Sequence, residues 1–91
     1  MSRRDEWRRV LDSEMARWAA KSSEQLLAEL HDPPLAYETE MDSKMYQVEV
    51  ELLENIPEYL HVMVGVDDGH LPAAMFPVSQ TFICRKTHPP K

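Results

Sequence analysis

The densest group of side chains that could do chemistry lies within one apolar run and in the turn after it. The group consists of His61, Asp67, Asp68 and His70. Zinc and other divalent metals accept imidazole nitrogens and carboxylate oxygens as ligands. Asp67 and Asp68 are neighbours that point to different sides of an extended chain, and Asp-Asp-Gly is also an ordinary turn sequence. A small-ligand or divalent-metal site that uses His61, Asp67 and His70 is therefore the alternative hypothesis, and no cofactor is assigned.

A nucleophilic site would need an activated serine, threonine or cysteine beside a base. Cys84 is the only cysteine, and Arg85 and Lys86 beside it could activate its thiol. The nearby His88 lies in a proline-rich tail, which is a poor place to hold a catalytic pair. A glycine-rich phosphate loop is excluded, because the chain has only two glycines. The sequence predicts no catalytic residue, and we expect a protein that is not an enzyme.

Carboxylates recur at every second position in two consecutive runs. They are Glu38, Glu40, Glu49 and Glu51. If the chain turns near Asp42-Ser43, all four fall on the solvent face of adjacent strands. Paired carboxylates do acid–base work when a pocket removes them from water, whereas an open sheet face leaves them solvated. Because four like charges on neighbouring strands repel, this face favours a cationic partner.

A third run places an amphipathic patch beside these carboxylates. The candidate interaction surface consists of Glu38, Glu40, Glu49, Glu51, Tyr59, His61 and Met63. The same pattern also fits an ordinary solvated sheet face. If the surface is functional, we expect its partner to be a basic protein or a second copy of the chain.

Apolar residues at every second position predict the strands that would carry this surface. Residues 44–54 alternate with Tyr46, Val48, Val50 and Leu52 on one side and Gln47, Glu49 and Glu51 on the other. Two further runs have the same period, with Leu35, Tyr37, Thr39 and Met41 in one and Leu60, Val62, Val64 and Val66 in the next. A last run directs Phe76, Val78 and Phe82 inward, and its Pro77 predicts an edge strand.

Residues 3–20 have the spacing of one amphipathic helix. Its apolar stripe contains Trp7, Val10, Leu11, Met15, Trp18 and Ala19, and its water-facing side contains Arg4, Arg8, Asp12 and Glu14. Ser22 and Gln25 have capping-box spacing, which predicts a second helix that buries Leu26, Leu27 and Leu30. Pro33 and Pro34 end it.

The sequence therefore predicts a single α+β domain over residues 1–91. Two N-terminal helices, at about 3–20 and 23–31, pack on one face of a four-stranded antiparallel meander sheet. The strands are expected at about 35–41, 45–54, 59–66 and 74–84, and a polar tail at 85–91.

Charge and composition exclude several classes of protein. The net charge of −6 argues against nucleic acid, whose phosphates need a basic surface. No apolar stretch approaches the roughly 20 residues of a membrane span. The start of the chain is charged, unlike a secretory signal, and a single cysteine shows no need for an oxidising compartment. We therefore expect a cytoplasmic protein.

The function that fits these observations best is protein contact. We expect a small acidic, non-enzymatic interaction or dimerising domain, and an inhibitor or immunity-type protein for a basic target is one form of it.

Overall fold

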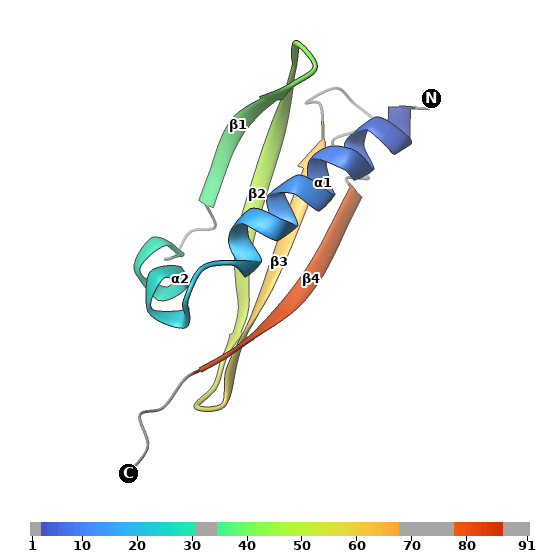
Figure 1. Cartoon of the computed structure of the whole chain (residues 1–91). Helices are drawn as coiled ribbons and strands as arrows, with labels where there is room; N and C mark the ends of the chain where they lie inside the picture. Colours follow the sequence, from blue (N-terminus) through green and yellow to red (C-terminus); the bar gives the residue numbers. More distant parts are fainter. Residues whose placement is uncertain (1–2, 31–34, 68–77, 87–91) are drawn as a thin grey trace.

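The computed structural model describes residues 3–30, 35–67 and 78–86 (Figure 1). Within these residues two helices come first, α1 (Arg3–Ala19) and α2 (Ser23–Glu29). The strands of the described chain are β1 (Leu35–Met41), β2 (Lys44–Asn55), β3 (Tyr59–Asp67) and β4 (Val78–Arg85). They form one antiparallel sheet in the order β1-β2-β3-β4, which confirms the predicted α+β meander.

The predicted strand bounds agree closely with the structure for β1, β2 and β3. The fourth strand was predicted from residue 74, and that early part, with Phe76 and Pro77, lies outside the described residues. β4 is at an edge of the described sheet, as predicted. β4 runs one residue beyond its predicted end at about residue 84, because Arg85 still pairs with Tyr59. The amide of Lys86 also donates to the Glu58 carbonyl at 3.1 Å.

A two-residue turn sets the register between β1 and β2. Asp42 and Ser43 have φ angles of 53° and 65°, and Met41 pairs with Lys44 on either side of them. Two consecutive residues with positive φ are typical of a type I′ turn, whose twist matches that of the strands it joins. The predicted tight turn is confirmed.

The capping box predicted at the start of α2 is present. The Gln25 amide donates to Ser22 Oγ at 3.2 Å, and the Ser22 amide donates to Gln25 Oε1 at 2.9 Å. Leu26 and Leu30 are buried in the core. The helix ends at Glu29 instead of the predicted residue 31, because Leu30 adopts extended dihedral angles.

The core lies between the helices and one face of the sheet. α1 packs across β3 and β4, and its buried side chains are Trp7, Val10, Leu11, Glu14 and Trp18. They meet the inner residues of the sheet, including Val48, Val50, Val62, Val64 and Val66, each at most 1% exposed. Burying such an aliphatic side chain stabilises the fold by ~1.5–3 kcal/mol. The other face of the sheet carries the exposed half of the alternation.

The prediction that Glu14 lies on the water-facing side of α1 is wrong. Glu14 is only 5% exposed, because its carboxylate accepts a hydrogen bond from the Tyr37 hydroxyl. The same hydroxyl accepts from Trp18 Nε1 at 2.8 Å, so this polar network joins α1 to β1. Ala19, predicted to be in the apolar stripe, is exposed at the end of the helix.

A β-bulge interrupts the pairing of β2 with β3 between Leu52 and Glu54. The extra residue, Leu53, is 43% exposed. In a regular strand that included Leu53, Glu54 would be on the same side as Leu52, since side chains alternate along a strand. The bulge instead places Glu54 opposite His61, on the face away from the core.

Candidate functional site

The outer face, the side of the sheet turned away from α1, holds every residue of the predicted interaction surface. The pairing of the strands places Glu38, Glu40, Glu49, Glu51, Tyr59, His61 and Met63 there. The four glutamates come from β1 and β2, and the other three residues come from β3. Their alternation with buried residues is the local reason for this placement.

One row across the outer face consists mostly of small side chains. Ala36 of β1, Glu49 of β2, Gly65 of β3 and Ser79 of β4 are paired in succession. Long side chains occupy the adjoining rows, with Gln47 next to Glu38 and Asp67 on one side and Met63 next to Glu51 on the other. The small row therefore lies below its neighbours.

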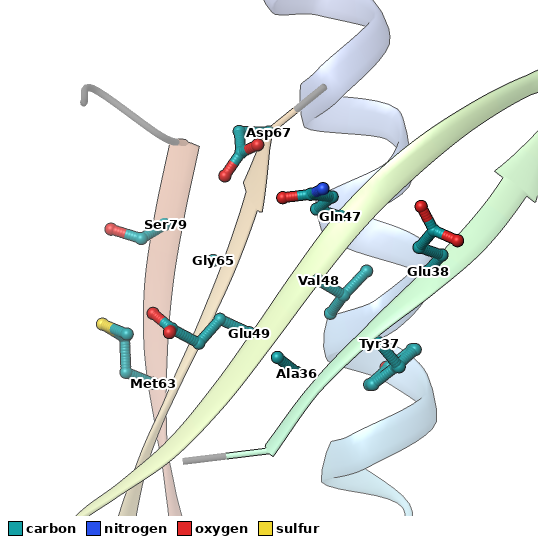
Figure 2. Close-up of a pocket in the computed structure, with 10 residues that line it drawn as sticks. All are labelled: Ala36, Tyr37, Glu38, Gln47, Val48, Glu49, Met63, Gly65, Asp67 and Ser79. Carbon is teal, nitrogen blue, oxygen red and sulfur yellow. The ribbon is translucent and has the colours of Figure 1, made fainter. Parts of the chain in front are cut away.

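This difference in size leaves a hollow of about 580 Å³ in the outer face, which we call the Gly65 hollow. Its lining residues are Ala36, Tyr37, Glu38, Gln47, Val48, Glu49, Met63, Gly65, Asp67 and Ser79. In Figure 2, Met63 and Glu49 lie on one side of Gly65, and Asp67 and Gln47 lie on the other. The hollow thus has a floor of mostly small residues around Gly65 and a rim of carboxylates, an amide and a thioether.

Nothing in the backbone or the packing requires a glycine at position 65. A Cβ there would lie 3.8 Å from Ser79 Cβ and 4.0 Å from the Val78 carbonyl oxygen, which is ordinary van der Waals contact. Gly65 also does not have the positive φ that favours glycine. A glycine within a strand costs about 0.5–1 kcal/mol relative to alanine. The fold therefore does not explain why this residue is a glycine. The consequence of the glycine is the empty space above it.

Carboxylates dominate the charge of the outer face. The acids of its described strands are Glu38, Glu40, Glu49, Glu51, Glu54 and Asp67, and the one base is Arg85. No ion pair or hydrogen bond joins the side chains of Glu38, Glu40, Glu49 or Glu51 to another residue of the described chain. These four carboxylates are available to a partner.

Several acids elsewhere in the described chain are paired with bases. Glu6 of α1 meets Lys44 Nζ at 2.9 Å, and Asp42 in the β1–β2 turn meets Arg9 at 3.4 Å. The Lys44 pKa is raised, first by its hydrogen bond to Glu6. These pairs hold the β1–β2 turn against α1, on the side of the sheet opposite to the outer face. Glu38, Glu40, Glu49 and Glu51 of the outer face have no such pair within the described chain.

The far end of the outer face holds a small polar cluster. His61 Nδ1 lies 3.3 Å from Glu54 Oε1, and the Tyr59 hydroxyl donates to the same oxygen at 3.5 Å. Both His61 and Tyr59 are half-buried. The cluster gives that end of the face fixed side chains, in contrast to the exposed glutamates.

The structure does not support a metal site that combines His61 with Asp67. The two residues are six positions apart on β3, a separation of about 20 Å along a strand. His70 and Asp68 lie outside the described residues. In residues 3–30, 35–67 and 78–86, no group of three His, Cys, Asp or Glu side chains could hold a metal ion. The ligand-binding alternative stays a prediction.

Cys84 is half-buried on the inner side of β4, opposite Leu60. Its thiol lies 3.9 Å from the Arg85 carbonyl oxygen. The histidine with which it might have paired, His88, is outside the described residues. This environment is that of a packing residue next to the core.

The hollow was not predicted from the sequence. Ala36, Gln47, Asp67 and Ser79 were absent from the predicted surface. The signal that could have found the hollow is that the small residues Ala36, Gly65 and Ser79 lie in one row. Recognising this row requires the register of all four described strands, which no single run of sequence gives.

No protein-family model, curated protein or solved structure matches this chain. In the described part of the chain, neither helix is long and apolar enough to cross a membrane.

Proposed function

We propose that this chain is a non-enzymatic binding protein whose outer face docks a basic segment of a partner protein. A lysine or arginine side chain of that segment enters the Gly65 hollow. The observation that carries the proposal is an unfilled hollow of about 580 Å³ over a glycine that the fold does not need, rimmed by carboxylates.

Electrostatics support a basic partner. Neighbouring carboxylates ~7 Å apart repel by about 0.6 kcal/mol per pair in water, and a docked cation replaces this repulsion with attraction. The net charge of −6 adds long-range attraction, which raises the rate at which a cationic partner arrives. The repulsion among the unpaired glutamates is therefore present in the free protein and relieved in the complex.

The chemistry of the hollow suits a long cationic side chain. Lysine and arginine combine an apolar stem with a charged end. Met63 and Ala36 offer the stem apolar contacts, while Glu38 and Glu49 at the rim are placed for the charge. A short acidic or apolar side chain would use only one half of this arrangement.

Two observations support binding without catalysis. Glu38 and Glu49 are exposed to water, whereas carboxylates that act as general acids or bases lie in pockets that exclude it. The sheet face is also open, with no element of the described chain closing over it (Figure 1). A single cysteine is compatible with the cytoplasm, where we place this function.

The first test is binding of a fluorescein-labelled decapeptide of alternating arginine and serine, followed by fluorescence anisotropy. We expect the dissociation constant to rise about tenfold between roughly 50 and 500 mM salt, because the attraction is screened. Glu49→Gln should weaken binding by about threefold or more, since it removes a charge at the rim.

Asp12→Asn is the matched control, because it removes the same charge from the exposed side of α1. It should leave the affinity within about twofold of the unmodified protein. A peptide of alternating glutamate and serine should not bind. Equal affinity for the two peptides, or affinity indifferent to salt, would contradict a basic partner.

A further inference from the structure

The outer edge of β4 is open in the described structure. β4 pairs with β3 on one side only and is the last strand of the sheet (Figure 1). No backbone hydrogen bond joins its other side to another part of the described chain. About half of its eight residues therefore direct an N–H and a C=O group outward, where no partner lies within residues 3–30, 35–67 and 78–86.

Between Val78 and Cys84, β4 lacks the features that normally protect such an edge. Edge strands usually carry lysine, proline or a bulge that prevents another strand from pairing. From Val78 to Cys84 the strand has no charged residue and no proline, and its pairing with β3 runs without a bulge. Ile83 on this strand is 51% exposed. The sequence of β4 is therefore suited to accept another strand.

The opposite edge of the sheet differs in charge. β1 carries Glu38 and Glu40 on its exposed side. Antiparallel pairing of β1 with β1 of a second copy would bring these carboxylates opposite or diagonal to one another, which is unfavourable. Pairing β1 with β4 of another copy would join different surfaces and produce an open chain of subunits. Pairing of β4 with β4 avoids both problems.

We propose that β4 pairs antiparallel with β4 of a second copy of this chain about a two-fold axis. The two sheets then form one continuous eight-stranded sheet, and no carboxylate of one strand faces a carboxylate of the other. This dimer is independent of the proposed docking of a basic partner. It places both outer faces on the same side, so that two Gly65 hollows can engage one partner.

The geometry limits the axis to a few positions. Directly opposed residues of antiparallel strands lie on the same face, so the axis must pass through a residue and not between two. An axis at Thr81 sets Ser79 opposite Ile83 of the second copy. An axis at Phe82 sets Phe82 opposite itself and Thr81 opposite Ile83. Both arrangements cover the exposed Ile83 with a side chain of the partner.

The test begins with light scattering after size exclusion at roughly 100 µM protein, where a contact of micromolar affinity is populated. The expected mass is twice the 10.6 kDa of one chain. Thr81→Lys should shift the mass to the monomer, because position 81 lies opposite or diagonal to its own copy and the added charges repel. Ile83→Lys should do the same, because it replaces an apolar contact at the paired edge with a charge. Ser13→Lys, on the exposed side of α1, is the matched control and should remain dimeric.

Cysteine cross-linking then locates the axis. In a Cys84→Ser background, Thr81→Cys or Phe82→Cys should form a disulfide-linked dimer under mild oxidation, because opposed residues at the axis are within disulfide reach. Ser13→Cys in the same background should not. A monomer at every concentration, or a dimer that Thr81→Lys and Ile83→Lys leave intact, would overturn the proposal. Gly65→Val should keep the dimer, which separates this result from failure of peptide docking.

Discussion

Gly65 lies in the middle of β3, at a position where an alanine would fit. Its backbone does not require glycine, and the nearest atom to an added Cβ would be 3.8 Å away. Its effect on the molecule is the space above it, between the carboxylates of Glu49 and Asp67. At the residue scale, the outer face is therefore defined by a missing side chain as much as by the acidic ones.

We predict that Gly65→Ala stabilises the folded state by about 0.5–1 kcal/mol, since alanine lowers the entropy of the unfolded chain and meets only ordinary contacts. Urea unfolding followed by tryptophan fluorescence measures this change. Ser79→Gly in the same row is the control and should destabilise by a similar amount. A Gly65→Ala variant less stable than the unmodified protein would mean that the glycine serves the fold.

At the scale of elements, α1 is joined to the sheet by apolar packing and by one polar network. Apolar residues of α1 meet the valines of β2 and β3, while Glu14 and Trp18 hold the Tyr37 hydroxyl of β1. Arg17 adds to this end, because its guanidinium lies 5.6 Å from the Tyr37 ring centre and 3.6 Å from Glu14. The network fixes β1 relative to α1.

The pKa of Tyr37 is raised from 10.0 to about 12, first by burial and then by its hydrogen bond to Glu14. Because the folded state holds this proton more tightly than the unfolded state, the stability it contributes is fully present below pH 10. That stability is lost as the pH rises through about 12.

Tyr37→Phe should therefore destabilise the protein by ~1–3 kcal/mol at pH 7, since it leaves the buried Glu14 and Trp18 groups without their shared partner. It should also lose stability less steeply between pH 10 and 12 than the unmodified protein. Urea midpoints across this range measure both effects. Tyr59→Phe is the control, because its hydroxyl is 3.5 Å from an exposed carboxylate and should contribute little. Equal slopes for the two variants would contradict the role of Tyr37.

Local patterns predicted most of these elements correctly. The alternation of residues 44–54 predicted the buried side of β2, and Ser22 with Gln25 predicted the start of α2. Each of these signals acts within a few residues of the chain. Interactions across longer distances were missed: Glu14 is buried because of Tyr37, which is 23 residues away. The bulge at Leu53 and the hollow likewise depend on the neighbouring strand and not on one run alone.

At the scale of the whole molecule, charge is distributed unevenly between the two layers. α1 has five arginines against four acids, whereas the outer face of the sheet includes the unpaired glutamates. This concentration of acids orients the molecule as it approaches a basic partner and favours contact through the acidic face. The proposed pairing of β4 would double that face without adding a repulsive contact.

If a cationic side chain of the partner enters the Gly65 hollow, a side chain that fills the hollow must weaken binding. Gly65→Val and the control Thr81→Val place the same side chain in neighbouring rows of the outer face, inside and outside the hollow. The measurement is the affinity of each variant for the labelled arginine–serine decapeptide. We predict that Gly65→Val weakens binding about tenfold while remaining folded, and that Thr81→Val leaves binding unchanged. Equal affinity of the folded Gly65→Val variant and the unmodified protein would contradict the account.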